Sequence, residues 1–132
     1  KAVELLRSSG ATVEEIEFPE HLQDLPEWHS IVFNSDGRTA FLPEYRFDKS
    51  KIAGQLIGHV ENNGRISRAA QLKAFDDIAS ARPVVDAMFS KYDAVLTPSV
   101  PDEAPEGIDS TGSAAFNKIW TVHAPYDTLR YA

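Results

Sequence analysis

The sequence predicts an α/β fold: a partial sheet of two or three strands with about five helices, in a single partial domain over residues 1–132. Three observations support this prediction. Residues 11–19 and 93–97 have the apolar patterns of strands. Several longer segments carry apolar residues at helical spacing. The first helix leads through a glycine into a strand, which is the second half of a parallel crossover unit.

The chain opens with this helix, glycine and strand. An apolar stripe at helical spacing predicts a helix over residues 1–9, and Gly10 stands where a left-handed cap ends a helix. In the strand over residues 11–19, Ile16 and Phe18 share one face. A crossover unit requires a parallel strand earlier in the chain. We therefore expect this sequence to begin in the middle of a fold, with more chain before it.

Two further helices and a connection are predicted next. Asp24 as a cap and Pro26 near the first helical position predict a helix over residues 24–41. Residues 41–50 are polar and aromatic-rich, which indicates a connection. A second apolar stripe predicts a helix over residues 50–64, where an Asn-Gly pair ends it.

A long helix and the second strand follow. Ser67 is the predicted cap of a helix over residues 67–92. Pro83 should kink this helix, because proline removes a backbone donor and collides with the preceding turn. Residues 93–97 form a short apolar run that predicts a buried strand.

A proline-rich, acidic loop over residues 98–110 follows the second predicted strand. Its prolines, which fix φ and donate no hydrogen bond, prevent the strand from continuing. A short helix is predicted over residues 113–122. No internal repeat and no low-complexity tract occurs in the chain.

Composition restricts the partners and the location of the chain. The net charge of −7 and the pI near 5.0 argue against nucleic acid and anionic membranes as partners, because both attract basic surfaces. The chain has no cysteine, which excludes disulfides, thiolate catalysis and Cys-ligated metals. No apolar stretch approaches the roughly 20 residues of a membrane span. We expect a cytoplasmic protein without metal or cofactor.

No spacing of side chains in the sequence predicts a catalytic centre. Ser8 and Ser9 precede a glycine, but they lie at a helix end, which favours a cap over a nucleophile loop. Adjacent acidic residues such as Asp76 and Asp77 point apart and do not form a carboxylate dyad. The histidines lack metal-binding spacing; they are His21, His29, His59 and His123. The residues alone therefore predict no catalytic group and no metal ligand.

Two parts of the sequence resemble amidase-signature enzymes. Residues 92–125 resemble the C-terminal part of that family, in which YD-apolar-apolar-TP is followed by P…AP and then by TG…FN…WT…P. Residues 6–19, LRSSGATVEEIEFP, are similar to the family's helix–strand segment L…GA.V.E…P. The matching residues of the C-terminal part are Tyr92, Asp93, Val95, Leu96, Thr97, Pro98, Pro101, Ala104, Pro105, Thr111, Gly112, Phe116, Asn117, Trp120, Thr121 and Pro125.

The resemblance implies a fragment of the amidase-signature α/β/α fold, the C-terminal segment of an amidohydrolase that cleaves a carboxamide C–N bond. In that family a serine nucleophile, a second serine in a cis peptide and a lysine base belong to a part N-terminal to the one resembled here. We therefore expect the chain to contribute sheet, cover helices and part of a substrate pocket, and to be inactive alone. Its final YDTLRYA departs from the family, whose members continue into another strand.

The candidate substrate-binding residues follow the second strand, because open α/β sheets bind ligands beyond the carboxyl ends of their strands. They are Thr97, Thr111, Phe116, Asn117 and Trp120. Each has a structural alternative. Phe116 and Trp120 are four apart on a short helix and would also suit a core, while Asn117 would also suit a role in holding a loop backbone. The expected partners are an amide substrate and the N-terminal remainder of the enzyme.

An alternative function remains open on the sequence. A free-standing, non-catalytic α/β module with an incomplete sheet would present an open edge to a protein partner, or to a second copy in a homodimer. The gene distinguishes the two functions. A lysine and a Gly/Ser-rich segment encoded upstream of Lys1 favour the amidase, whereas a start codon just before Lys1 favours the module.

Overall fold

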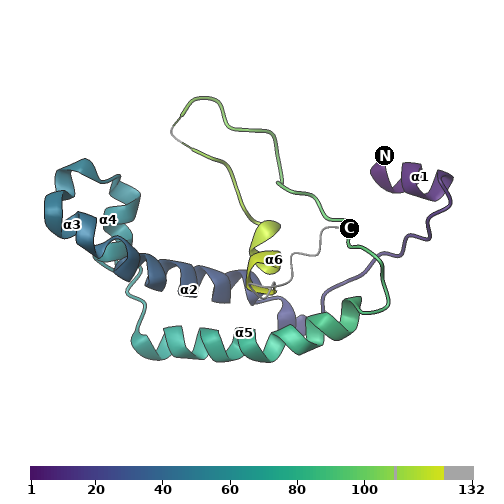
Figure 1. Ribbon diagram of the computed structural model, residues 1–132, viewed down its shortest axis with the longest axis horizontal. Coiled ribbons are helices and arrows are strands. Elements are labelled where there is room, and N and C mark those ends of the chain that lie inside the picture. Colours follow the sequence, from purple (N-terminus) through teal and green to yellow (C-terminus); the bar gives the residue numbers. More distant parts are fainter. Residues whose placement is uncertain (109, 124–132) are drawn as a thin grey trace.

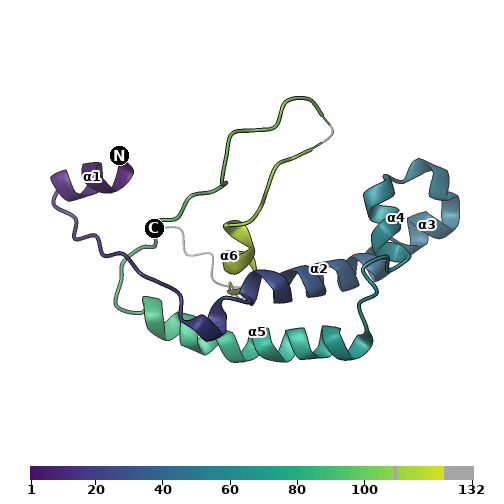
Figure 2. The ribbon, with the colours of Figure 1, turned by 180° about the vertical axis from the view of Figure 1, so that it is seen from behind.

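The computed structural model describes residues 1–108 and 110–123, and it consists of helices joined by coil (Figures 1 and 2). The α-helices are α1 (Ala2–Ser8), α2 (Leu25–Ala40), α3 (Leu42–Asp48), α4 (Gly54–Val60), α5 (Arg68–Phe89) and α6 (Asn117–His123). Short 3₁₀ helices occur at Glu20–Leu22 and Lys49–Lys51.

The predicted α/β fold is wrong, since no strand occurs anywhere in residues 1–108 and 110–123. Both segments predicted as strands, residues 11–19 and 93–97, are coil. Their apolar patterns suit strands, but a strand also needs a neighbour that supplies ladder hydrogen bonds. No backbone hydrogen bond joins the two segments to each other. A strand-like pattern without a pairing partner therefore leaves coil.

Helix α1 ends at the predicted glycine cap. Gly10 has φ of +93°, a conformation that costs glycine little. Its N–H donates to the carbonyl of Arg7 at 3.1 Å, and the N–H of Ala11 donates to the carbonyl of Leu6 at 3.1 Å. These two bonds form a Schellman motif, which satisfies the last carbonyls of the helix. The cap thereby directs the chain into the coil over residues 11–19.

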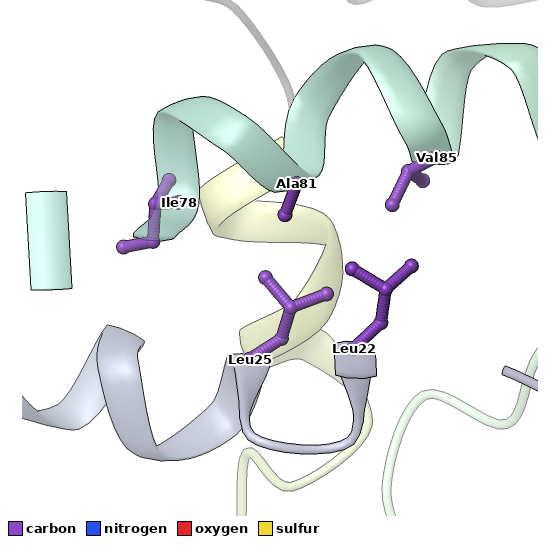
Figure 3. Packing of buried hydrophobic residues seen from close by; sticks show 5 residues of the cluster. All are labelled: Leu22, Leu25, Ile78, Ala81 and Val85. Carbon is purple, nitrogen blue, oxygen red and sulfur yellow. The ribbon is translucent and has the colours of Figure 1, made fainter. Parts of the chain in front are cut away.

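Helices α2 and α5 lie antiparallel side by side, and α6 packs against both (Figures 1 and 2). The main core lies between the beginning of α2 and the second half of α5 (Figure 3). The spacing of its α5 members by three and four residues puts them on one helix face. The five buried side chains of this cluster are Leu22, Leu25, Ile78, Ala81 and Val85. The core thus consists of one helix pair, with α6 as its cover.

Residues 41–50 contain helix α3 rather than the predicted connection. Pro43 lies in the first turn, where backbone N–H groups have no partner within the helix, so a proline fits there. The helix is tied to the end of α4 by Tyr45, whose hydroxyl donates to Glu61 at 2.8 Å. Lys49 pairs with the same carboxylate. The hydrogen bonds from Lys49 and then Tyr45 lower the pKa of Glu61.

Helix α5 begins at the predicted cap, where the Ser67 hydroxyl accepts a hydrogen bond from the N–H of Ala70 at 3.1 Å. It continues through Pro83 as a single helix. Leu72 and Phe75 have the helical spacing of a core face on this helix, but both are exposed. The pattern on this helix contains more apolar positions than its neighbours α2 and α6 cover.

The chain leaves much more surface exposed than a compact protein of its size. Its accessible surface is 10461 Å², whereas a compact monomer of 14.6 kDa exposes about 6900 Å². The exposed large apolar side chains include Leu5, Phe47 and Leu96. The chain therefore presents apolar surface that a further layer of protein could cover.

Candidate functional site

A large open groove lies at the end of the molecule that holds the two segments predicted as strands. We call it the coil groove. It is bordered by α1, by the coil over residues 10–18, by residues 89–97 and by the beginning of α6, and its volume is about 1110 Å³. It therefore collects residues from both parts of the sequence that resemble the amidase-signature family.

Contacts between side chains connect the two coil segments across the groove. The hydroxyl of Tyr92 donates to the carboxylate of Glu14, and the ammonium of Lys91 lies 3.6 Å from the same carboxylate. The hydrogen bond from Tyr92, followed by the charge of Lys91, lowers the pKa of Glu14. Glu14 is fully exposed, so solvent screens this interaction strongly. Side-chain contacts therefore join the two sides of the groove, and no backbone hydrogen bond between the two coil segments is present.

Three aromatic rings that line the groove contact one another. The ring centroids of Phe18 and Phe89 lie 6.0 Å apart, and Trp120 lies 6.3 Å from Phe18 and 5.6 Å from Phe89. Aromatic pairs at such distances, tilted or edge to face, add to the free energy of burial. The three rings come from the N-terminal coil, α5 and α6. They join these three segments at one point.

The structure brings some of the predicted substrate-binding residues together. Three of the five line the coil groove; they are Thr97, Phe116 and Trp120. Asn117 does not line the groove; its side-chain amide donates to the carbonyl of Ser99 at 3.0 Å and so holds the proline-rich loop against α6. Thr111 is exposed in coil and does not line the groove either. Pro125, the last residue of the matched pattern, lies outside the described residues.

The two serines at the end of α1, beside the groove, have no base as a hydrogen-bond partner. The hydroxyls of Ser8 and Ser9 both donate to the carbonyl of Leu5, at 2.8 and 2.9 Å, as capping side chains do. Groups of three or more potential metal-binding side chains are absent from the described part of the chain. Among the same residues, no helix has both the length and the apolar character required to cross a bilayer.

His29 on α2 is a feature to which sequence reasoning assigned no role. Its Nδ1 is buried without a hydrogen-bond partner, and its ring stacks on Phe33 with centroids 5.9 Å apart. Burial, followed by the positive charge of Lys118 on α6, lowers the pKa of His29. The Lys118 ammonium also donates to the hydroxyl of Ser30 at 3.1 Å. A proton on His29 would therefore oppose the contact that holds α6 on α2.

The free energy of unfolding is expected to fall as the pH drops below about 6.5, the ordinary pKa of histidine. The folded state lowers the pKa of His29, so the unfolded chain takes up the proton first. The corresponding stability is present above the ordinary pKa and is lost on acidification. Urea denaturation between about pH 7.5 and 5.5 measures the effect. His29→Gln, which does not titrate, should flatten the profile, and equal slopes for both proteins would contradict this account.

Comparisons with known proteins give no assignment: no family model, curated protein or solved structure matches the chain.

Proposed function

We propose that the chain is the C-terminal segment of an amidase-signature amidohydrolase, which in complete form hydrolyses a carboxamide C–N bond. The observation that carries the proposal is the ordered motif over residues 92–125 together with the upstream segment over residues 6–19. These segments lie far apart in the sequence, yet both border the coil groove. Segments that share one site in an enzyme are expected to meet in space, so this convergence supports the proposal.

The proposed role of the chain is structural support for a substrate pocket, not catalysis. Helices α2, α5 and α6 would form a cover, and Thr97, Phe116 and Trp120 would form a wall beside the bound amide. Asn117 would act indirectly, by holding the loop that follows Thr97. The nucleophile and the base would come from the N-terminal part of the enzyme, as the resemblance implies. A cytoplasmic location belongs to the proposal, and a composition without cysteine is compatible with it.

The isolated chain is expected to release no ammonia from simple amides, because the resemblance places the serine nucleophile and the lysine base in a part N-terminal to these residues. The longer protein encoded by its gene is expected to release ammonia, and to contain a lysine and a Gly/Ser-rich segment before Lys1. A coupled ammonia assay over aliphatic and aromatic amides compares the two proteins. Trp120→Ala in the longer protein should raise KM more than it changes kcat, since a pocket wall binds substrate without taking part in the chemistry.

Two results would overturn the proposal. One is a start codon immediately before Lys1 with no encoded chain upstream. The other is turnover by the isolated chain that Ser8→Ala or Ser9→Ala abolishes, which would locate the nucleophile in α1.

A second function is favoured by a different observation. The exposed surface exceeds that of a compact monomer by about 3500 Å², more than a stable protein interface of about 1600 Å² requires. A non-catalytic helical module that binds a protein partner would use this surface. A start codon directly before Lys1, together with a monomer that gains stability when a partner is added, would favour the module over the amidase segment.

A further inference from the structure

Almost all of the net charge belongs to the segments that border the coil groove and to the loop beside it. Residues 1–20 hold five acidic and two basic residues, a net charge of −3, and residues 91–108 hold four acidic residues and one basic residue, again −3. Residues 21–90, which include α2 to α5, are close to neutral with nine acidic and eight basic residues. The groove therefore lies in the strongly acidic part of a chain whose total charge is −7.

The coil on both sides of the groove has unpaired backbone groups. No backbone–backbone hydrogen bond is made by residues 12–18 or by residues 93–97 within the described part of the chain. The guanidinium of Arg7 donates to the carbonyl of Val13, and this is a side-chain contact. Backbone groups in exposed coil are hydrated, and they are free to pair with an added segment that approaches in an extended conformation.

The walls of the groove are apolar, and its charged lining is acidic on balance: Glu14, Glu15 and Asp93 outnumber Arg7 and Lys91, and Lys91 pairs with Glu14. Leu6, Val95 and Leu96 line the groove and are exposed. Two acidic residues on the rim, Glu15 and Asp93, also line it and are exposed. An extended peptide has side chains that alternate between opposite faces, so one face can bury apolar groups while the other reaches charges.

We infer that the coil groove binds an extended polypeptide segment in which basic residues alternate with apolar ones. Its backbone would pair with residues 12–18 or 93–97, its apolar side chains would cover Val95 and Leu96, and its basic side chains would approach Glu15 and Asp93. The inference rests on the proposed function in one respect: if the chain is a segment of a longer enzyme, another polypeptide segment of that enzyme is expected to cover the groove. A second copy is a poor occupant, because two like-charged acidic rims would repel.

Fluorescence anisotropy of a short labelled peptide that alternates lysine with valine tests the inference on the full chain. We expect saturable binding that is at least about 10-fold tighter than binding of the matched peptide with glutamate in place of lysine. Binding should weaken as the salt concentration rises, because salt screens the exposed charges. N-methylation of alternate peptide amides should abolish binding, because it removes the donors that pair with the coil.

Matched variants locate the binding. The double variant Glu15→Gln/Asp93→Asn should weaken binding of the lysine peptide several-fold, while Glu44→Gln/Asp76→Asn makes the same change of charge on α3 and α5 and should leave binding unchanged. All four side chains are exposed, and circular dichroism should confirm that both variants fold alike. Equal loss in both variants would overturn the inference, because it would show a response to net charge alone.

Three other outcomes also decide the matter. Equal affinity for the lysine and glutamate peptides, or no binding of either, overturns the inference. A homodimer in sedimentation that Glu15→Gln/Asp93→Asn strengthens would assign the groove to a second copy instead. These results leave the proposed function unaffected, since ammonia release by the longer protein tests that function separately.

Discussion

Leu25→Ala is expected to lower the free energy of unfolding by about 3 kcal/mol, the cost of deleting a buried leucine together with the cavity that remains. Leu25 is 2% exposed and packs at the first turn of α2 against the core face of α5 (Figure 3). Because this core has few fully buried side chains, the remaining ones cannot compensate for the contacts that Leu25 loses. Urea denaturation followed by circular dichroism measures the change.

The matched control is Leu5→Ala on α1. Leu5 is 68% exposed, so its replacement should change the free energy of unfolding by less than about 0.5 kcal/mol. Similar effects of the two substitutions would show that the core between α2 and α5 does not dominate stability.

Trp120→Ala is expected to lower the free energy of unfolding by about 2 kcal/mol. Truncation of a buried aromatic side chain costs about 3–5 kcal/mol, and Trp120 is only half-buried. Its ring contacts Phe18 and Phe89, so the substitution removes the side chain that joins α6 to the N-terminal coil and α5. Thermal unfolding measures the loss, and Trp28 on α2 remains as a fluorescent reporter of the helix pair.

Trp120→Phe is the control for this prediction. A phenylalanine keeps a ring in contact with Phe18 and Phe89, and should retain most of the stability that alanine loses. Hydrogen exchange gives a second readout: with alanine at position 120, the amides of α6 should exchange faster while those of α5 stay protected. Faster exchange throughout α5 would contradict the assignment of α6 as a cover.

Local signals in the sequence predicted most of the helices. Gly10 as a cap, Pro26 in the first turn of α2 and Ser67 as the cap of α5 act through their immediate neighbours, so the structure confirms them. A signal of the same kind was overlooked for α3: residues 41–50 were predicted as a connection from their polar, aromatic-rich composition, although Pro43 stands where proline is favoured, in the first turn of a helix.

Features that depend on distant partners could not be predicted in the same way. Whether residues 11–19 and 93–97 become strands depends on a neighbouring strand, and no local pattern supplies one. Leu72 and Phe75 have the spacing of a core face, but burial depends on which helix packs there. For the candidate site, sequence order proposed Thr97 and Trp120, which line the groove. The sequence left Asn117 with two alternatives, a pocket residue or a residue that holds the loop, and its contact with Ser99 favours the second.

The arrangement of the core also determines the order in which the chain can fold. Leu22 and Leu25 precede α3 and α4 in the sequence, whereas Ile78, Ala81 and Val85 follow them. Neither half of the core is buried until the intervening segment closes as a loop, and the entropy of that closure opposes folding before any apolar surface is gained. The ties of Tyr45 and Lys49 to Glu61 shorten the effective loop. The segment that contains α3 and α4 therefore affects the rate at which the core assembles, although it contributes no side chain to the core cluster.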